Sequence, residues 1–279
     1  MGLQSRAMPK RTLRCGGQEI RCMKDILNHR EYGTGFPVVI LHGLFGSLRN
    51  WMPVAKSLSE LFRVAVPDAR NHGESFWSDS MSYPEMADDV ARWMDAAGIR
   101  KAHLIGHSLG GKTAMTLALK RPERIGRLIV VDIAPVDYRN SFAETLSALA
   151  KLPLDSLRDR AEADDLLAAD IPDGSLRTFL VGNLIKRRDR FRWRINLNGI
   201  AGNIGKITTF PHLSPNPFRA PVLFMKGEHS DYLAPRYFAD IFRLFPEASI
   251  KAVPRSGHLP HIENPAACCQ IIKEFFAED

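Results

Sequence analysis

Short, nearly continuous apolar runs recur along the chain and alternate with longer segments in which polar and apolar residues are mixed. In the first half, the apolar runs occupy residues 38–43, 62–68, 102–108 and 127–135. Strands with so few polar residues are typical of a parallel sheet that helices cover on both faces. The mixed segments that predict helices are 50–60, 84–97 and 111–121. This alternation predicts right-handed crossover units of an α/β fold.

The pattern changes after the fourth run. From about Pro135 to Arg219 the chain has helical segments and no obvious strand. Strand-like runs resume at 220–227 and 248–254, with a helix between them around 235–244 and a closing helix after the last run. We therefore expect a sheet interrupted by a helical insertion. The predicted division is 1–134 for the first part of the core, 135–219 for a helical cap and 220–279 for the second part of the core.

Composition and charge narrow the class of protein. A chain of 279 residues with 45% hydrophobic content can bury one large core. The net charge of +7 raises the question of nucleic acid, but lysine and arginine are dense only in "KRRDRFRWR" at 186–194. No nucleic-acid fold signature accompanies this cluster, so we interpret it as a solvated basic helix face. We expect no nucleic-acid partner, and a monomer or a homodimer.

The cysteines and the N-terminus bear on location. Cys15, Cys22, Cys268 and Cys269 match neither a zinc pattern nor a disulfide framework, which predicts free thiols in a reducing compartment. The N-terminus has no apolar signal core, and no segment approaches the length of a membrane span. We expect a cytoplasmic protein without membrane insertion. A short arginine-containing organelle leader is the alternative.

A serine stands among glycines where a predicted strand meets a predicted helix, in "HLIGHSLGGKTAM" at 103–115. A GxSxG turn in this place is the nucleophile elbow, which lifts the serine side chain above the sheet. Small residues at Gly106, Gly110 and Gly111 let strand and helix approach. Ser108 is therefore the candidate nucleophile. The alternative is an ordinary glycine-rich turn.

A serine nucleophile needs a base, normally an imidazole oriented by a carboxylate. His258 follows the last predicted strand in a glycine-containing loop and is the best-placed candidate. His261 is its nearest rival, and we expect it to pack beside the final helix. His107 should point away from the adjacent serine, and His42 is expected to be structural.

Acyl transfer also needs two donors for the oxyanion. The backbone N–H of Leu109, next after the nucleophile, is one candidate. The loop after the first apolar run supplies the other, with Leu44 preferred and Phe45 as the fallback. The polar segment "DARNHG" at 68–73 is interpreted as a tight loop held by hydrogen bonds from side chains to the backbone.

Five motifs together resemble the α/β-hydrolase family, and in particular its small bacterial carboxylesterases with mitochondrial relatives. They are "LHGLFGS", "DARNHGES", "GHSLGGKTAM", "VVDIAPVDY" and "SGHLPHIENP". The resemblance extends over nearly the whole chain from about residue 36. It implies an eight-stranded, mostly parallel sheet with a helical cap inserted after strand 6. It also implies ester hydrolysis without any cofactor.

The acid partner of the histidine is open in the sequence. Most of the family places it after the seventh strand, where one register gives Ser230 and another gives Asp231. Some members of the branch instead have a serine at that place and take the acid from the end of the sixth strand. That position here is Asp132, which we prefer over Asp231. Asp137 is a third possibility.

The sequence thus predicts a serine esterase acting on small to medium acyl groups, with no metal or cofactor. Candidate substrate-binding residues are Phe45 and, in the cap, Phe179, Leu184 and Trp193, although the cap residues could instead form its own core. The charge density of the basic cluster suggests the hypothesis that its arginines attract anionic esters or acyl thioesters. Thioester, lactone or carbon–carbon bond hydrolysis would use the same residues. A ligand-binding protein with negligible turnover is the alternative outside enzymes.

Overall fold

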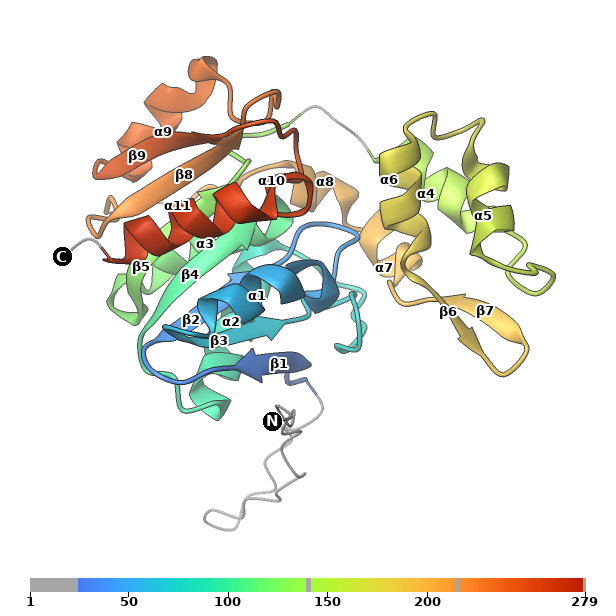
Figure 1. The fold of residues 1–279 in the computed structure, drawn as a ribbon, viewed down its shortest axis with the longest axis horizontal. Helices are drawn as coiled ribbons and strands as arrows, with labels where there is room; N and C mark the ends of the chain where they lie inside the picture. Colours follow the sequence, from blue (N-terminus) through green and yellow to red (C-terminus); the bar gives the residue numbers. More distant parts are fainter. Residues whose placement is uncertain (1–24, 139–141, 214–215, 278–279) are drawn as a thin grey trace, which may run out of the picture.

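The structure, a computed structural model, describes residues 25–138, 142–213 and 216–277 (Figure 1). Its main sheet has seven strands in the order β1-β3-β2-β4-β5-β8-β9. The strands are β1 (His29–Tyr32), β2 (Pro37–Leu41), β3 (Arg63–Pro67), β4 (Ala102–His107), β5 (Ile125–Val131), β8 (Val222–Gly227) and β9 (Ala248–Val253). Strand β1 is antiparallel to β3, and the other neighbouring pairs are parallel. The predicted α/β class is confirmed.

The predicted count of eight strands is wrong for the described residues. The main sheet of the described residues has seven strands, one fewer than predicted. Strand β1 has the sequence HREY and was not predicted, because it has no apolar run and lies at the sheet edge. Residues 1–24, which include Cys15, Cys22 and the segment considered as a leader, lie outside the described residues.

Five main helices cover the two faces of the sheet, and they define two apolar cores. The helices are α1 (Met52–Leu58), α2 (Tyr83–Ala96), α3 (Leu109–Lys120), α9 (Phe238–Leu244) and α11 (Pro265–Ala277). Alternate residues of one strand point to opposite faces. Val38 and Ile40 of β2 accordingly pack with α1 and α11, while Val39 and Leu41 pack with α2, α3 and α9. No helix in the described residues is long and apolar enough to cross a membrane.

An insertion lies between β5 and β8 and stands to one side of the sheet (Figure 1). It contains α4 (Ala143–Ala150), α5 (Arg160–Leu167), α6 (Gly174–Val181), α7 (Leu197–Ala201), α8 (Ile204–Thr208) and a hairpin of β6 (Leu184–Arg187) and β7 (Arg190–Trp193). In chain order it follows the fifth strand of the main sheet, one earlier than predicted, because the described sheet has one strand fewer. A short additional helix, α10 (Pro260–Glu263), precedes α11.

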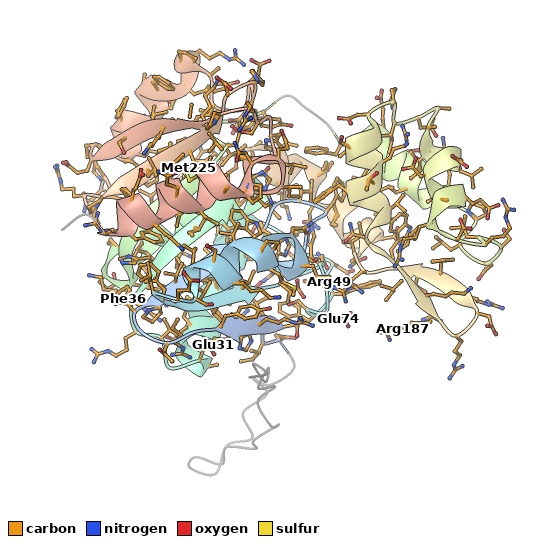
Figure 2. All side chains as sticks on the ribbon, viewed as in Figure 1. Glu31, Phe36, Arg49, Glu74, Arg187 and Met225 are labelled. Atoms are coloured by element: carbon orange, nitrogen blue, oxygen red, sulfur yellow. The ribbon has the colours of Figure 1, made fainter. Side chains whose placement is uncertain are left out.

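The basic cluster at 186–194 lies in the β6–β7 hairpin, so its interpretation as a helix face is wrong. Side chains of β7 alternate, with Phe191 buried between exposed neighbours, which is the two-residue period of a strand. Arg188 has φ 55° in the turn. Arg187 pairs with Glu74 of the loop after β3 at 3.6 Å, which links the hairpin to the core (Figure 2).

Candidate active site

Ser108 occupies a sharp bend between β4 and α3, with φ 49° and ψ −112°. The bend is fixed from both sides, because the Ser108 N–H donates to the Val131 carbonyl at 3.1 Å and its carbonyl accepts from the Lys112 N–H at 3.0 Å. A Cβ added at Gly106 would lie 2.3 Å from the Gly110 carbonyl oxygen. Strand and helix therefore meet at backbone contact, as a nucleophile elbow requires.

His258 lies in the loop after β9, beside the elbow. The Nε2 atom of His107 is 2.7 Å from the His258 carbonyl oxygen, and since a carbonyl can only accept, the imidazole of His107 donates. The Nδ1 atom of His258 is 2.8 Å from Oδ2 of Asp132. The ring of Tyr232 stacks on the imidazole, with centroids 3.9 Å apart. These contacts fix the orientation of the His258 ring.

The carboxylate of Asp132 is fully buried at the end of β5. Its Oδ1 accepts from the Gly227 N–H at 2.9 Å, and its Oδ2 accepts from the hydroxyl of Ser230 as well as from His258. Both additional donors follow from the sheet order, because β8, which ends at Gly227, lies next to β5. Asp132 itself has φ 51°, an uncommon backbone conformation that aims the side chain across the strand ends.

The other two candidate acids lie elsewhere. Asp231 is exposed and has no hydrogen bond or ion pair within the described part of the chain. Asp137 is also exposed, and its Oδ1 accepts from the backbone N–H of Phe210 at 2.7 Å. Of the three acids, Asp132 is the one that the structure brings to the imidazole.

The remaining histidines near the elbow are buried and hydrogen-bonded or stacked. His42 accepts from the Ala69 N–H at 3.0 Å, and His261 stacks on Trp51 with centroids 4.1 Å apart. Burial lowers the pKa of His42, lowers that of His261 well below its usual value, and lowers that of His107 to about 3. They are neutral at physiological pH, as expected for structural side chains.

This buried cluster predicts acid sensitivity of the fold. His42, His72, His107 and His261 all have a lowered pKa when folded, whereas in the unfolded chain each returns to about 6.5. Below pH 6.5 the unfolded state therefore binds more protons, and stability falls as the pH falls. Each histidine should cost up to about 1.4 kcal/mol per pH unit below 6.5. Urea denaturation between pH 7.5 and 5.0 measures this, and an unchanged midpoint would contradict it.

The loop after β2 carries the candidate oxyanion donors. It contacts the elbow, because a Cβ added at Gly43 would lie 3.4 Å from the Ser108 Cβ. The N–H of Phe45, the second choice as oxyanion donor, already donates to Nε2 of His72 at 3.2 Å. Burial lowers the pKa of His72 to about 3, so its ring is neutral and accepts this bond. The N–H groups of Leu44 and Leu109 remain as the candidate pair.

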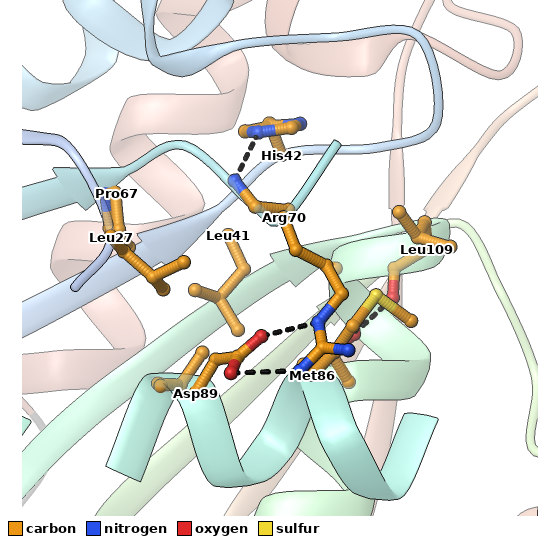
Figure 3. Close-up of a pocket in the computed structure, with 12 residues that line it drawn as sticks. Leu27, Leu41, His42, Pro67, Arg70, Met86, Asp89 and Leu109 are labelled. Carbon is orange, nitrogen blue, oxygen red and sulfur yellow. Dashed lines mark hydrogen bonds and ion pairs between the residues drawn. The ribbon is translucent and has the colours of Figure 1, made fainter. Parts of the chain in front are cut away.

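The segment "DARNHG" supports that loop. Asp68 accepts from the Leu48 N–H at 2.8 Å and from the Glu74 N–H at 3.0 Å. Arg70 forms a buried ion pair with Asp89 of α2 at 2.6 Å, which Figure 3 shows below His42. These bonds agree with the prediction of a tight loop held by side chains. The segment contributes stability to the site rather than reactive groups.

The comparisons with known proteins agree with this geometry. A family model described as alpha/beta hydrolase fold matches residues 37–265. The chain belongs to the alpha/beta hydrolase family. The predicted resemblance is confirmed.

Relatives of this hydrolase are named for ester cleavage. The protein "sn-1-specific diacylglycerol lipase ABHD11" of Mus musculus is 39% identical over 86% of this chain and 80% of its own length. "Esterase YbfF" of Escherichia coli is 32% identical over 86% of this chain and 92% of its own. The solved "Marine microorganism esterase" has a TM-score of 0.87 and 36% identity, and the match covers 90% of this chain and 99% of that one. The predicted class of enzyme, an ester hydrolase, is thereby confirmed.

A small pocket opens beside Ser108 of this hydrolase. Its walls combine the elbow, the oxyanion loop and the insertion. They are Leu44, Tyr83, Ser108, Leu109, Lys112, Ile133, Tyr138, Phe142, Ile207, Thr208 and Tyr232. The predicted substrate-binding residues Phe45, Phe179, Leu184 and Trp193 are not among these walls. They belong to the apolar cluster that the insertion forms with the main domain, where a large apolar side chain is stabilised by burial.

Sequence analysis missed three polar groups of this site. Lys112 and Tyr138 line the pocket, and Tyr232 stacks on His258. Lys112 had a signal, because it stands within the apolar elbow helix one turn after Ser108. Tyr138 and Tyr232 had none, since they belong to loops whose positions depend on the folded sheet. In the described residues, no cluster of histidine, cysteine and acidic side chains is able to hold a metal ion.

Proposed function

We propose that the chain is a serine esterase that hydrolyses carboxylic esters of small to medium acyl groups through an acyl-enzyme on Ser108. The observation that carries the proposal is the contact between His258 and the buried Asp132 beside the elbow, at 2.8 Å. A serine hydroxyl is a weak nucleophile and needs a neutral, correctly oriented imidazole. The elbow, the imidazole and the carboxylate come from three separate strand ends of one sheet.

In the proposed reaction, Nε2 of His258 takes the proton of the Ser108 hydroxyl as its oxygen attacks the ester carbonyl carbon. The resulting oxyanion accepts from the N–H groups of Leu109 and Leu44. The intermediate collapses, the bond to the alcohol oxygen breaks, and the imidazolium gives its proton to that oxygen. A water molecule, deprotonated by the same imidazole, then attacks the acyl-enzyme. The acid leaves as the imidazolium gives its proton to the Ser108 oxygen.

Asp132 acts through the imidazole. A carboxylate that accepts from Nδ1–H leaves Nε2 free as the base, and it stabilises the imidazolium that forms. The additional bonds from Gly227 and Ser230 hold both carboxylate oxygens in place. This arrangement supports Asp132, rather than Asp231 or Asp137, as the acid of the proposed triad.

We also propose that the enzyme acts in the cytoplasm and does not use nucleic acid as a partner. The free thiols of Cys268 and Cys269 support a reducing compartment. The arginines of the hairpin carry the basic charge, and Arg187 and Arg190 are engaged in ion pairs with Glu74 and Asp155.

A substrate panel tests the proposed reaction. It contains p-nitrophenyl esters from two to sixteen acyl carbons, a diacylglycerol, an acyl thioester and a lactone. We expect kcat/KM to be highest for the short and medium esters, because the pocket is small, and turnover of all substrates to disappear in Ser108→Ala. Preference for the thioester or lactone would assign the same residues to those bonds. No turnover of any substrate would favour a ligand-binding protein.

A further inference from the structure

Lys112 is a buried cation within the candidate active site. It lies one helical turn after Ser108 on α3, it lines the same pocket, and only 2% of it is exposed. Removing an ammonium group from water is costly unless hydrogen bonds and opposite charge compensate. The position of Lys112 is therefore unexpected for a side chain that has only a packing role.

The contacts of the ammonium group offset part of the cost of removing it from water. Nζ donates to the Thr208 carbonyl at 3.1 Å and to the Thr209 carbonyl at 3.0 Å, at the end of α8. It also lies 4.9 Å from the ring centre of Tyr138 and 5.6 Å from that of Tyr83. An ammonium has three N–H donors. Within the described residues, two of them meet an oxygen acceptor.

Among the described residues, the ammonium group of Lys112 has no neighbouring group of opposite charge within ion-pair distance. In the part of the chain that the structure describes, no carboxylate lies within 4.0 Å of Lys112. The charge of Asp137 interacts with Lys112 only beyond ion-pair distance, and its Oδ1 accepts a hydrogen bond from the Phe210 N–H. Burial consequently lowers the pKa of Lys112 to about 7.

We propose that Lys112 forms a carboxylate-binding subsite, so that the enzyme prefers esters whose acyl chain ends in a free carboxylate. This inference rests on the proposed esterase function and names its substrate class. Apart from Ser108 and Thr208, the other walls of the pocket are apolar or aromatic, including Leu44, Phe142 and Ile207. A single cation among such walls selects which polar group is bound. A bound carboxylate would supply the absent counter-charge, whereas an alkyl end would cover the ammonium without compensation.

A purely structural role makes a different prediction. The bonds from Lys112 to the end of α8 also attach the insertion to the elbow helix. If attachment were the whole role, loss of the ammonium would change the pocket for every ester equally. Comparison of a charged and a neutral substrate of the same shape therefore separates the two roles.

The experiment measures kcat/KM for monoethyl adipate and for its neutral amide, ethyl adipamate. The corresponding monoethyl ester and amide of succinic acid and of glutaric acid are measured in the same way. We expect wild type to prefer the anion about ten- to a hundredfold, the range of a hydrogen bond to a charged group. Lys112→Met should remove most of this preference. Lys120→Met is the matched control, because Lys120 pairs with Asp88 at the exposed end of the same helix, and should keep the preference. An unchanged preference in Lys112→Met would overturn the subsite.

A second measurement needs no variant at Lys112. In wild type, the ratio of kcat/KM for the anion to that for the amide should fall as the pH rises from 6 to 8.5, because the ammonium loses its proton. An effect of pH on the ester chemistry itself is shared by both substrates and cancels in the ratio. Around Lys112, burial raises the pKa of Tyr83 and Tyr138, so both stay neutral over this range, and Asp137 is the acidic side chain whose charge acts on Lys112. A flat ratio, or no preference for the anion in any pair, would overturn the proposal.

Failure of the subsite and failure of the esterase proposal are distinguishable. If Ser108→Ala hydrolyses these esters as fast as wild type, the proposed function is wrong. If Ser108→Ala is inactive while wild type treats anion and amide alike, only the carboxylate subsite is wrong.

Discussion

Asp132→Asn is expected to lower kcat for ester hydrolysis about 10⁴-fold, the loss seen when the orienting carboxylate of such triads becomes an amide. The amide side chain is able to present its NH₂ group to the imidazole, which favours the tautomer with the proton on Nε2. That tautomer cannot accept the proton of Ser108. Initial rates with a p-nitrophenyl ester of medium length measure the effect.

The matched control is Asp231→Asn. Asp231 is exposed and lies outside the hydrogen-bond network of His258, so the rate of this variant should stay within a few-fold of wild type. Thermal denaturation of both variants separates a loss of fold from a loss of chemistry. A large rate loss in Asp231→Asn, with Asp132→Asn active, would show that the acid assignment is wrong.

Ser108→Ala and His258→Ala are each expected to lower kcat about 10⁶-fold, because the two residues act as one unit. For the same reason the double variant should be no slower than either single variant. Ser108 is bound to its surroundings through backbone atoms. The imidazole of His258 also contacts Asp132 and Tyr232, so thermal denaturation has to show that His258→Ala is folded. Steady-state rates of the three variants test this prediction.

His261→Phe provides the control for His258. His261 lies three residues after His258 and stacks on Trp51. An aromatic ring of similar size should keep that packing. Its activity should remain close to that of wild type. Rate losses that multiply in the Ser108 and His258 double variant would contradict a shared role, and inactivity of His261→Phe with a normal fold would point to the wrong histidine.

The local features of this protein were predictable because short sequence patterns dictate them. The elbow depends on glycines within four residues of Ser108, where backbones meet at contact distance. The parallel strands depend on apolar runs that only a doubly covered sheet can bury. Both kinds of signal lie within a few residues of the feature that they predict.

The features that the sequence left open or did not reveal depend on non-local contacts. Asp132 and Asp231 both follow strand-like runs, and only the pairing of β5 with β8 shows which one reaches His258. The hairpin at 184–193 was predicted as a helix face because its five basic residues and one acid mask the alternation of buried side chains. Lys112 has a polar sequence character but a buried position, which the apolar period of α3 alone did not reveal.

The dependence of Ser108 on His258 is tested most directly by labelling with a fluorophosphonate and locating the adduct by peptide mass spectrometry. The structure predicts one adduct, on Ser108, in wild type, and none in Ser108→Ala. It predicts that labelling in His258→Ala is slower by several orders of magnitude. An adduct on another residue, or equal labelling rates in wild type and His258→Ala, would contradict the proposed mechanism.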